Sequence, residues 1–417
     1  MLDIKFIRQN PDIVKQAAKN KNVAVDVDKL LALDERRRHV QGELDQANSF
    51  RNAIAKASEG GKPTLDQIAE GKKYKEQAAE LDREIKTVEQ ELQELLYKVP
   101  NIPTEDTPIG TSEADNKIIK EWGEKPAFDF TPKPHWELGE TLDIIDNERA
   151  GNVSGARFTY LKREAAMMEY ALVQYALSVI IKKGFVPIVP PMFIKPDVYQ
   201  KMARLEPKEE RYYIPSDDMY LIGSAEHTLG PMHMDEIIPE KNLPLRYVAF
   251  SPALRREAGA AGKDTRGIIR LHEFHKVEMG VFSTAEQAID EHKNLIVIQE
   301  ELLQGLGLPY QVILKCTADI GDPNARGVDI NTWMPGQDRF CETHTADYMA
   351  DYQARRLSTK YRKSDSETAF VHMNDATALA IGRTIAAIIE NYQQPDGSIK
   401  IPDVLKLWMM GITEIKR

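Results

Sequence analysis

The sequence is poor in several features that would assign a protein class at once. Its 417 residues include only two cysteines, Cys316 and Cys341, which excludes a disulfide framework and favours a reducing compartment. No apolar run reaches the ~18 residues that a membrane span requires. The first residues, MLDIKFIRQNPD, match neither a secretory signal nor an Arg-rich transit peptide. We therefore expect a cytoplasmic protein that does not span a membrane.

Signatures of nucleotide and metal binding are also missing. No Walker-type Gly-Lys-Ser/Thr loop occurs, so any ATP must be held by another architecture. The His-Glu-Phe-His run at 272–275 lacks the i, i+4 histidine spacing of a zinc protease, and the cysteines lack metal-ligand spacing. We expect no zinc site. A net charge of −10 argues against non-specific coating of nucleic acid, although one RNA of defined shape can still bind a local patch.

Residues 27–98 carry two apolar stripes at coiled-coil spacing. The first contains Leu30, Leu33, Val40, Leu44, Ala47 and Ile54, with Arg37 and Arg51 at seam positions that the apolar residues skip. A break at Glu59-Gly60-Gly61-Lys62-Pro63 separates it from a second stripe, formed by Tyr74, Ala78, Leu81, Ile85, Val88, Leu92 and Leu95. We predict an antiparallel helical hairpin with arms of roughly 40 Å each. The heptads alone leave open whether it binds a partner or is a dimerisation coil.

The remaining chain predicts two domains and an α+β fold. Residues 1–26 indicate a short helical cap starting at Asn10-Pro11-Asp12, and the prolines of Val99–Pro103 indicate an extended neck. We therefore expect an N-terminal domain, 1–103, and a second domain, 104–417. Helix-period runs cover 162–183, 285–306, 348–362 and 378–392, and strand-like runs cover 186–189, 219–222, 246–250, 269–277 and 311–314. Because the strands cluster instead of alternating with helices, the sheet should be largely antiparallel.

The most informative stretch is residues 254–282, LRREAGAAGKDTRGIIRLHEFHKVEMGVF. It predicts two strands around a Gly-rich loop that carries Lys263, Arg266 and Gly267. Since side chains two apart share a face of a strand, we expect a common surface formed by Arg255 and Glu257 on the first strand and Arg270, Phe274 and Glu278 on the second. Arginine binds phosphate or carboxylate, an aromatic ring stacks on a base, and a carboxylate accepts from an ammonium or hydroxyl group. The pattern suits a nucleotide bound beside a zwitterion; the alternative is a surface hairpin with solvated charges.

Further candidate residues lie outside this hairpin. Ser224 and Glu226 follow a predicted strand and could bind an ammonium group. Glu342 is a candidate ligand for magnesium on a phosphate. Arg383 lies in an apolar helix that opens at Asp375, and a buried guanidinium without a partner costs several kcal/mol. Either an anionic ligand such as a γ-phosphate or a carboxylate from elsewhere in the chain would balance it.

Together these segments resemble the seryl-tRNA synthetases of the common bacterial type, a family of class II aminoacyl-tRNA synthetases, over essentially the whole chain. Lys183–Phe193 resembles motif 1, which lies at the dimer interface. Leu254–Glu278, with its Arg-x-Glu-Ala-Gly and Arg-x-His-x-Phe elements, resembles motif 2, and Ala378–Tyr392 resembles motif 3. The hairpin at 27–98 resembles the tRNA-binding arm. The resemblance implies a class II antiparallel-sheet catalytic domain flanked by helices, assembled as a homodimer.

The resemblance also implies an activity. L-serine and ATP, with Mg²⁺, would give seryl-adenylate and pyrophosphate, and the seryl group would pass to the 3′ end of tRNA(Ser), with tRNA(Sec) as a further candidate acceptor. The arm of one subunit would grip the long variable arm of a tRNA bound to the other. RNA shape and backbone contacts would supply the recognition.

The family's site residues carry over to matching positions of this sequence. Those implied for serine are Ser224, Glu226, Arg255, Glu278 and Thr377. Those implied for ATP are Arg255, Glu257, Arg270, Phe274, Glu342, Thr345 and Arg383, of which Arg255, Glu342 and Arg383 are the catalytic set. Glu257 would meet the adenine amino group, Phe274 and Arg383 would stack on the two faces of the ring, and Glu342 would hold Mg²⁺ through ATP.

The sequence departs from the family at Ser224, where threonine is usual, and at Asp375, where asparagine is usual. Three alternatives compete with a serine–tRNA ligase. A synthetase-like enzyme that charges a carrier protein would lack the arm that this chain has. A catalytically inactive paralogue would be expected to lose Arg255, Glu342 or Arg383, all of which are present. The zinc-dependent archaeal type would differ in its N-terminal domain.

Overall fold

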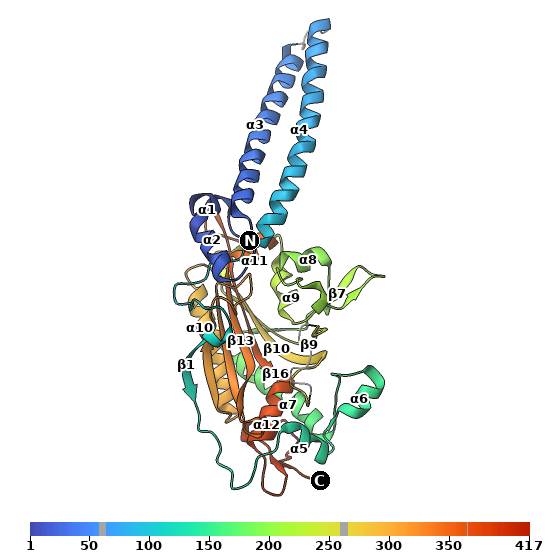
Figure 1. Ribbon diagram of the computed structural model, residues 1–417, viewed down its shortest axis with the longest axis vertical. Helices are drawn as coiled ribbons and strands as arrows, with labels where there is room; N and C mark the ends of the chain where they lie inside the picture. Colours follow the sequence, from blue (N-terminus) through green and yellow to red (C-terminus); the bar gives the residue numbers. More distant parts are fainter. Residues whose placement is uncertain (58–63, 259–265, 365) are drawn as a thin grey trace. The chain divides into compact units, whose positions relative to one another are not determined.

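The computed structural model describes residues 1–57, 64–258, 266–364 and 366–417. It divides into two compact units, Met1–Ile102 and Pro103–Arg417, which Figure 1 shows in blue and in the colours from cyan to red. The predicted Gly-Gly-Lys-Pro turn at 60–63 and the loop residue Lys263 lie outside the described residues.

The first unit is a helical hairpin on two short helices. Helix α1 spans Ile4–Gln9, and α2 spans Pro11–Asn20, with Asn10 at its N-cap and proline at its first position, as predicted. The long helices α3, Val27–Ala57, and α4, Leu65–Lys98, lie side by side (Figure 1). Because the connection between them is short, they run antiparallel, so the predicted hairpin is confirmed. Its seam buries Val40, Ala47, Ala78, Leu81 and Ile85.

A buried carboxylate joins α1 to α3. Asp34 is 0% exposed, yet the Nε atoms of Arg8 and Arg38 each lie 3.2 Å from Oδ2, and Nη2 of Arg37 lies 3.6 Å from Oδ1. A buried carboxylate is tolerated only when it is paired. The arginine that the heptad pattern placed in the seam, Arg37, is therefore one of the cations that balance this buried charge.

The second unit is built on an eight-stranded sheet in the order β1-β11-β12-β13-β16-β10-β9-β4. Every neighbouring pair is antiparallel except β4 and β9, which confirms the largely antiparallel sheet. In the same order the strands span Lys117–Trp122, Tyr310–Leu314, Arg326–Met334, Arg339–Ala350, His372–Ala380, Glu273–Ser283, Leu245–Leu254 and Val186–Ile188.

The other elements surround this sheet (Figure 1). The helices are α5 His135–Thr141, α6 Asn147–Ser154, α7 Arg163–Ile180, α8 Pro196–Lys201, α9 Glu226–Leu229, α10 Ala288–Gly305, α11 Tyr352–Leu357 and α12 Ile381–Asn391. The short strands are β2 Ile145–Asp146, β3 Tyr160–Leu161, β5 Phe193–Ile194, β6 Tyr213–Ile214, β7 Met219–Leu221, β8 Ile237–Pro239, β14 Lys360–Arg362, β15 Thr368–Phe370, β17 Ile399–Lys400 and β18 Glu414–Ile415.

The alternation of side chains along the central strands separates an apolar face from a polar one. Val277, Met279 and Val281 of β10 belong to the main core, together with buried residues of α7, α10 and α12. Lys276 and Glu278, which alternate with these residues in sequence, line a cavity on the opposite face. This period of two lets one strand hold the core with one set of residues and present charges with the other.

Helix α7 corrects one sequence expectation. Arg163–Lys183 is long and apolar enough, by length and composition alone, to cross a membrane, whereas no such run was expected. Met168, Leu172 and Ile180 of this helix are fully buried in the core of the second unit. The core helix of a globular protein passes the same test, and the packing of α7 is that of a core helix.

Several predicted boundaries are wrong. The strand predicted at 269–277 is β10, Glu273–Ser283, so Arg270 precedes it. Arg255 and Glu257 lie beyond the end of β9, where Glu257 has a φ of +51° that a strand does not allow.

Two predicted helices are also misplaced. The segment 348–362 contains the end of β13, the short α11 and β14, with left-handed residues at Ala350, where β13 ends, and at Ser358, where α11 ends. Asp375 and Thr377 lie on strand β16, and the helix begins only at Ile381. An apolar run in a central strand has the same sequence pattern as a buried helix, which explains the second error.

Candidate active site

A cavity of about 230 Å³ lies on the polar face of β10, β13 and β16. The lining residues include most of those predicted from the sequence: Glu226, Arg255, Glu257, Arg270, Phe274, Glu278, Glu342, Thr345, Thr377 and Arg383. They come from segments far apart in the chain, and the register of the sheet brings them together. The exception is Ser224, which is fully buried and does not line the cavity; no described residue hydrogen-bonds its hydroxyl.

One end of the cavity carries a hydroxyl and an ion pair from two neighbouring strands. The ammonium Nζ of Lys276 lies 2.7 Å from Oε2 of Glu278, and the Thr377 hydroxyl donates to the same oxygen at 3.3 Å. Burial raises the pKa of the Glu278 carboxyl. Lys276 lowers it, but burial has the larger effect, so the pKa of Glu278 lies above its ordinary value. Sequence reasoning missed Lys276, although its position two residues from both Phe274 and Glu278 was the signal that could have identified it.

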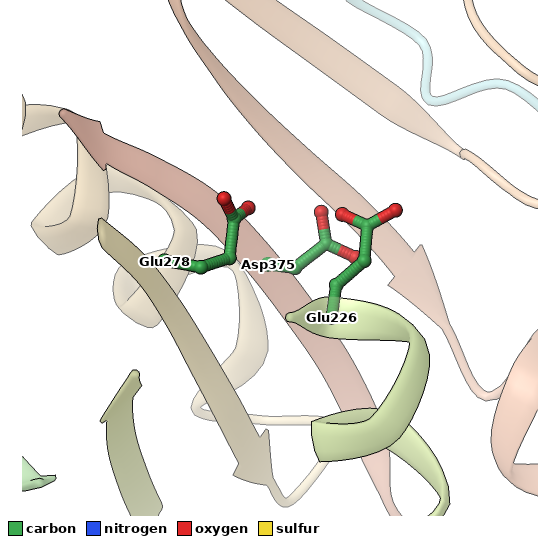
Figure 2. A group of neighbouring side chains, drawn as sticks. All are labelled: Glu226, Glu278 and Asp375. Carbon is green, nitrogen blue, oxygen red and sulfur yellow. The ribbon is translucent and has the colours of Figure 1, made fainter. Parts of the chain in front are cut away.

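Three carboxylates converge beside this pair. Figure 2 shows Glu226 from the start of α9, Glu278 from β10 and Asp375 from β16, pointing into a shared space. One oxygen of each lies within 4.8 Å of the others. Three acceptors around one point fit a cation, and an ammonium group has three N–H donors to offer. This end of the cavity can therefore hold a substrate amine.

A buried guanidinium that the sequence did not single out faces these acids. The Nε atom of Arg204 lies 3.4 Å from Glu226, and its Nη2 lies 3.5 Å from Asp347 and 3.6 Å from Asp375. Burial opposes its charge, but the three carboxylates outweigh that effect and raise the pKa of Arg204. Arg204 in turn holds the pKa of Glu226 well below its usual range, against the effect of burial. No local sequence motif marks Arg204, because the contacts come from distant segments.

The other end of the cavity contains an aromatic ring and three arginines, two of them paired with glutamates. The Arg255 guanidinium lies 5.3 Å from the centre of the Phe274 ring, and its Nε donates to the Gly223 carbonyl at 3.0 Å. Arg270 Nη1 donates to Glu257 Oε2 at 2.6 Å. An aromatic face flanked by arginines suits a base and its phosphates.

Arg383 closes this end, and its partner is a predicted metal ligand. Its Nη1 donates to the Glu342 carboxylate at 2.9 Å and to the Glu342 carbonyl at 2.7 Å, and its Nε donates to the Ile269 carbonyl at 3.3 Å. A carboxylate from elsewhere in the chain thus balances the guanidinium, which was one of the two alternatives. The Glu342 side chain is half exposed; its partial desolvation by the cavity walls would raise its pKa, but Arg383 and Lys315 outweigh this effect and hold the pKa below the usual value.

A bulge in β13 places Glu342 and Thr345 on the same face. Residues three apart in a regular strand point to opposite faces. Here Ile330 pairs with His344 and the next residue, Asn331, pairs with Glu342, so one extra residue, Thr343, is accommodated. Glu342 and Thr345 therefore both line the cavity.

A buried histidine supports the segment that leads from the Gly-rich loop back to the cavity. His135 is fully buried, with Nδ1 at 2.7 Å from Glu390, and its Nε2 accepts from the Ile268 N–H at 3.2 Å. A Cβ on Gly267 would lie 2.0 Å from that Nε2, so only glycine fits there. The sequence indicated Gly267 as part of the loop but gave no indication of its contact with His135.

Comparisons with known proteins agree with this geometry. Residues 1–103 match the family model "Seryl-tRNA synthetase N-terminal domain", and residues 211–392 match "tRNA synthetase class II core domain (G, H, P, S and T)". Two serine–tRNA ligases, from Symbiobacterium thermophilum and Thermoanaerobacter pseudethanolicus, are 41% and 42% identical to the chain. The first match covers 97% of this chain and 98% of the relative, and the second covers 98% of each.

Solved structures show the same likeness. The seryl-tRNA synthetase of Pyrococcus horikoshii complexed with ATP is 38% identical with a TM-score of 0.94, over 100% of this chain and 99% of that one. The cytoplasmic serine–tRNA ligase of Naegleria fowleri in complex with AMP is 30% identical with a TM-score of 0.90, with the same coverage. The chain belongs to the seryl-tRNA synthetase family.

Proposed function

We propose that this protein is an ATP-dependent serine–tRNA ligase that forms seryl-adenylate and transfers the seryl group to the 3′ end of tRNA(Ser). The observation that carries the proposal is the arrangement of one cavity. Carboxylates and a hydroxyl gather at one end, and an aromatic ring with arginines lies at the other. The relatives named serine–tRNA ligases and the related structures with ATP and AMP support it. No observation favours an inactive or carrier-charging paralogue.

At the nucleotide end, the arginines and Phe274 position ATP. The adenine ring stacks on Phe274 and under the Arg383 guanidinium, Glu257 accepts from the adenine amino group, and Arg270 holds Glu257 in place. Arg255 then grips the α-phosphate and the serine carboxylate, and this requires its guanidinium to move off the Phe274 ring. The chemistry needs no protein nucleophile, because the serine carboxylate itself attacks the α-phosphate and pyrophosphate leaves.

Glu342 and Thr345 fit the Mg²⁺ that accompanies ATP. The Glu342 side chain is 50% exposed, so its carboxylate is available, and hard cations prefer oxygen ligands of this kind. Bound there, Mg²⁺ would neutralise phosphate charge. Arg383 would exchange its pairing with Glu342 for contacts with the nucleotide.

Selectivity for serine comes from buried groups that need a hydroxyl partner. Glu278 is 1% exposed and Thr377 is 6% exposed. Alanine would leave them without that partner, and sites of this kind discriminate by up to ~10⁴-fold or more. Threonine has the hydroxyl, so the size of the cavity must exclude its methyl group.

The α3–α4 hairpin and the edge of the large sheet are the two surfaces to which we assign binding partners. We propose that residues 1–103 form the tRNA-binding domain, with the α3–α4 hairpin as the arm, and that 104–417 form the catalytic domain. Strand β4 lies at the edge of the large sheet, where Val186 is 51% exposed and Val189, just after it, is 95% exposed. An exposed apolar sheet edge favours burial in an interface, and a second copy of the chain in a homodimer would bury it. We also propose that the protein is located in the cytoplasm.

The decisive experiment is amino-acid-dependent exchange between ATP and pyrophosphate, with serine, threonine, alanine, cysteine and glycine compared. Serine should support exchange, and the others should support far less. Absence of exchange with all five would contradict the proposed enzyme. Equal exchange with threonine would contradict the assigned selectivity while leaving the adenylate chemistry intact.

A further inference from the structure

The amino-acid end of the cavity contains more carboxylates than cations. Glu226, Glu278, Asp347 and Asp375 line it, and the cations paired with them are Lys276 and Arg204; Lys315 also attracts Asp347, but it is paired with a further acid, Asp329, at 3.1 Å. The arginines and acids at the nucleotide end pair among themselves or remain for the phosphates. A bound serine would add one ammonium group. One carboxylate at this end would still lack a matching positive charge.

Asp375 is the carboxylate left over. It is 7% exposed and points into the cluster of three acids (Figure 2). Among the described residues it accepts no hydrogen bond, and its one ion pair is the 3.6 Å approach of Arg204. Glu278 has Lys276 at 2.7 Å, and Glu226 has Arg204 at 3.4 Å. Asp375 is therefore the acid with the weakest compensation.

The sheet places a further negative charge next to Asp375. Asp375 of β16 is directly opposite Asp347 of β13, and like charges at such a cross-strand position repel. The single guanidinium of Arg204 is shared between them at 3.5 Å and 3.6 Å, distances too long for strong charge-assisted hydrogen bonds. A second donor close to Asp375 would relieve this repulsion.

We propose that Asp375 gives the pocket a second ammonium position, so that it activates L-2,3-diaminopropionate, the serine analogue with an amino group in place of the hydroxyl. The inference rests on the proposed serine–tRNA ligase function. The α-ammonium would occupy the space between the three carboxylates, and the β-ammonium would lie between Asp375 and Glu278. Activation follows the same course as for serine. The substrate carboxylate forms a bond to the α-phosphorus of ATP, and the bond to the pyrophosphate leaving group breaks.

The surroundings of Asp375 also disfavour its negative charge. Burial and the nearby Glu226 raise the pKa of Asp375 well above its ordinary value, although Arg204 acts in the opposite direction. Glu278 and Lys276 from β10 and Asp347 from β13 are the other charged groups that face it.

The test is ATP–pyrophosphate exchange by the full-length protein with L-2,3-diaminopropionate, serine, alanine and 2-aminobutyrate. We expect kcat/KM for diaminopropionate to exceed that for alanine and 2-aminobutyrate by roughly tenfold or more, as one charge-assisted hydrogen bond predicts. Asp375→Asn should lower the ratio of diaminopropionate to serine kcat/KM by roughly tenfold or more. Asp290→Asn is the matched control, because it removes the same charge from a side chain on α10 that is 85% exposed, and it should leave the ratio unchanged.

The outcomes separate the two proposals. Normal serine exchange without diaminopropionate exchange would overturn the second ammonium position and leave the ligase intact. A loss of both activities in equal proportion in Asp375→Asn, with or without a lower melting temperature, would also overturn it, because a structural role does not change the ratio. Absence of exchange with every amino acid in the wild-type protein would overturn the ligase itself.

Discussion

Replacing Arg383 by alanine distinguishes a residue that acts on ATP from one that only supports the fold. Its guanidinium meets Glu342 at 2.9 Å, but the two side chains are 25% and 50% exposed. Water can therefore solvate Glu342 once Arg383 is gone, and partly exposed pairs contribute only about 0–1 kcal/mol. We expect the melting temperature to fall by about 2–4 °C or less.

The effect on activity should be far larger. If Arg383 stacks on adenine and donates to the phosphates, its loss removes preorganised donors from the transition state. Losses of this kind reduce rates by roughly 10²–10³-fold, or about 2.7–4 kcal/mol. Serine-dependent ATP–pyrophosphate exchange would measure the loss. Arg383→Lys should recover only part of it, since lysine keeps the charge but not the planar fork.

Arg246 offers a matched control for this experiment. It pairs with Glu291 through two contacts of 2.7 Å and 2.5 Å, and the side chains are 28% and 10% exposed. It does not line the cavity. Arg246→Ala should lower the melting temperature at least as much as Arg383→Ala and leave exchange unchanged. Wild-type exchange in Arg383→Ala, or a loss explained by its unfolding, would refute the assignment.

Three further predictions concern the arm, its base and the pH dependence. Replacing Leu30–Leu95 by a short turn should preserve adenylate formation and abolish tRNA charging; undiminished charging would refute the arm's role. Asp34→Ala should destabilise the helical unit by about 1–3 kcal/mol, because three arginines lose their shared partner, and urea unfolding followed by circular dichroism would show this. Because the pKa of Glu278 is raised, this carboxylate should become protonated at a higher pH than an ordinary glutamate. KM for serine should therefore rise as the pH falls while KM for ATP changes less, and parallel changes in both would contradict this.

The parts of this protein that follow a strict period were predictable from sequence. The two heptad stripes gave the hairpin, and the even spacing of Phe274 and Glu278 on β10 placed both in the cavity. The boundaries around the Gly-rich loop were not predictable in the same way. Glu257 adopts a left-handed conformation that an ordinary residue rarely takes, and nothing in its local sequence indicates it.

Residues that act through distant contacts escaped prediction for a different reason. Arg204 follows a short helix, and its three carboxylates come from α9, β13 and β16. His135 reaches Glu390 over 255 positions of sequence. Neither Arg204 nor His135 forms a recognisable motif with the residues next to it in sequence. Such contacts depend on the folded sheet, and a single sequence does not encode them as a local motif.

The bulge at Thr343 has a consequence for how this strand tolerates change. Cys341 and Ala346 both pack into the core although five positions separate them, just as Glu342 and Thr345 share the cavity. Both odd separations depend on the extra residue. Deleting Thr343 would leave a regular ladder in which Glu342 and Thr345 are two positions apart and Cys341 and Ala346 are four apart, so each pair would still share its face. The bulge therefore absorbs one additional residue without changing which neighbours face the cavity and which face the core, and this strand should tolerate the loss of Thr343 better than the loss of a residue on either side of it.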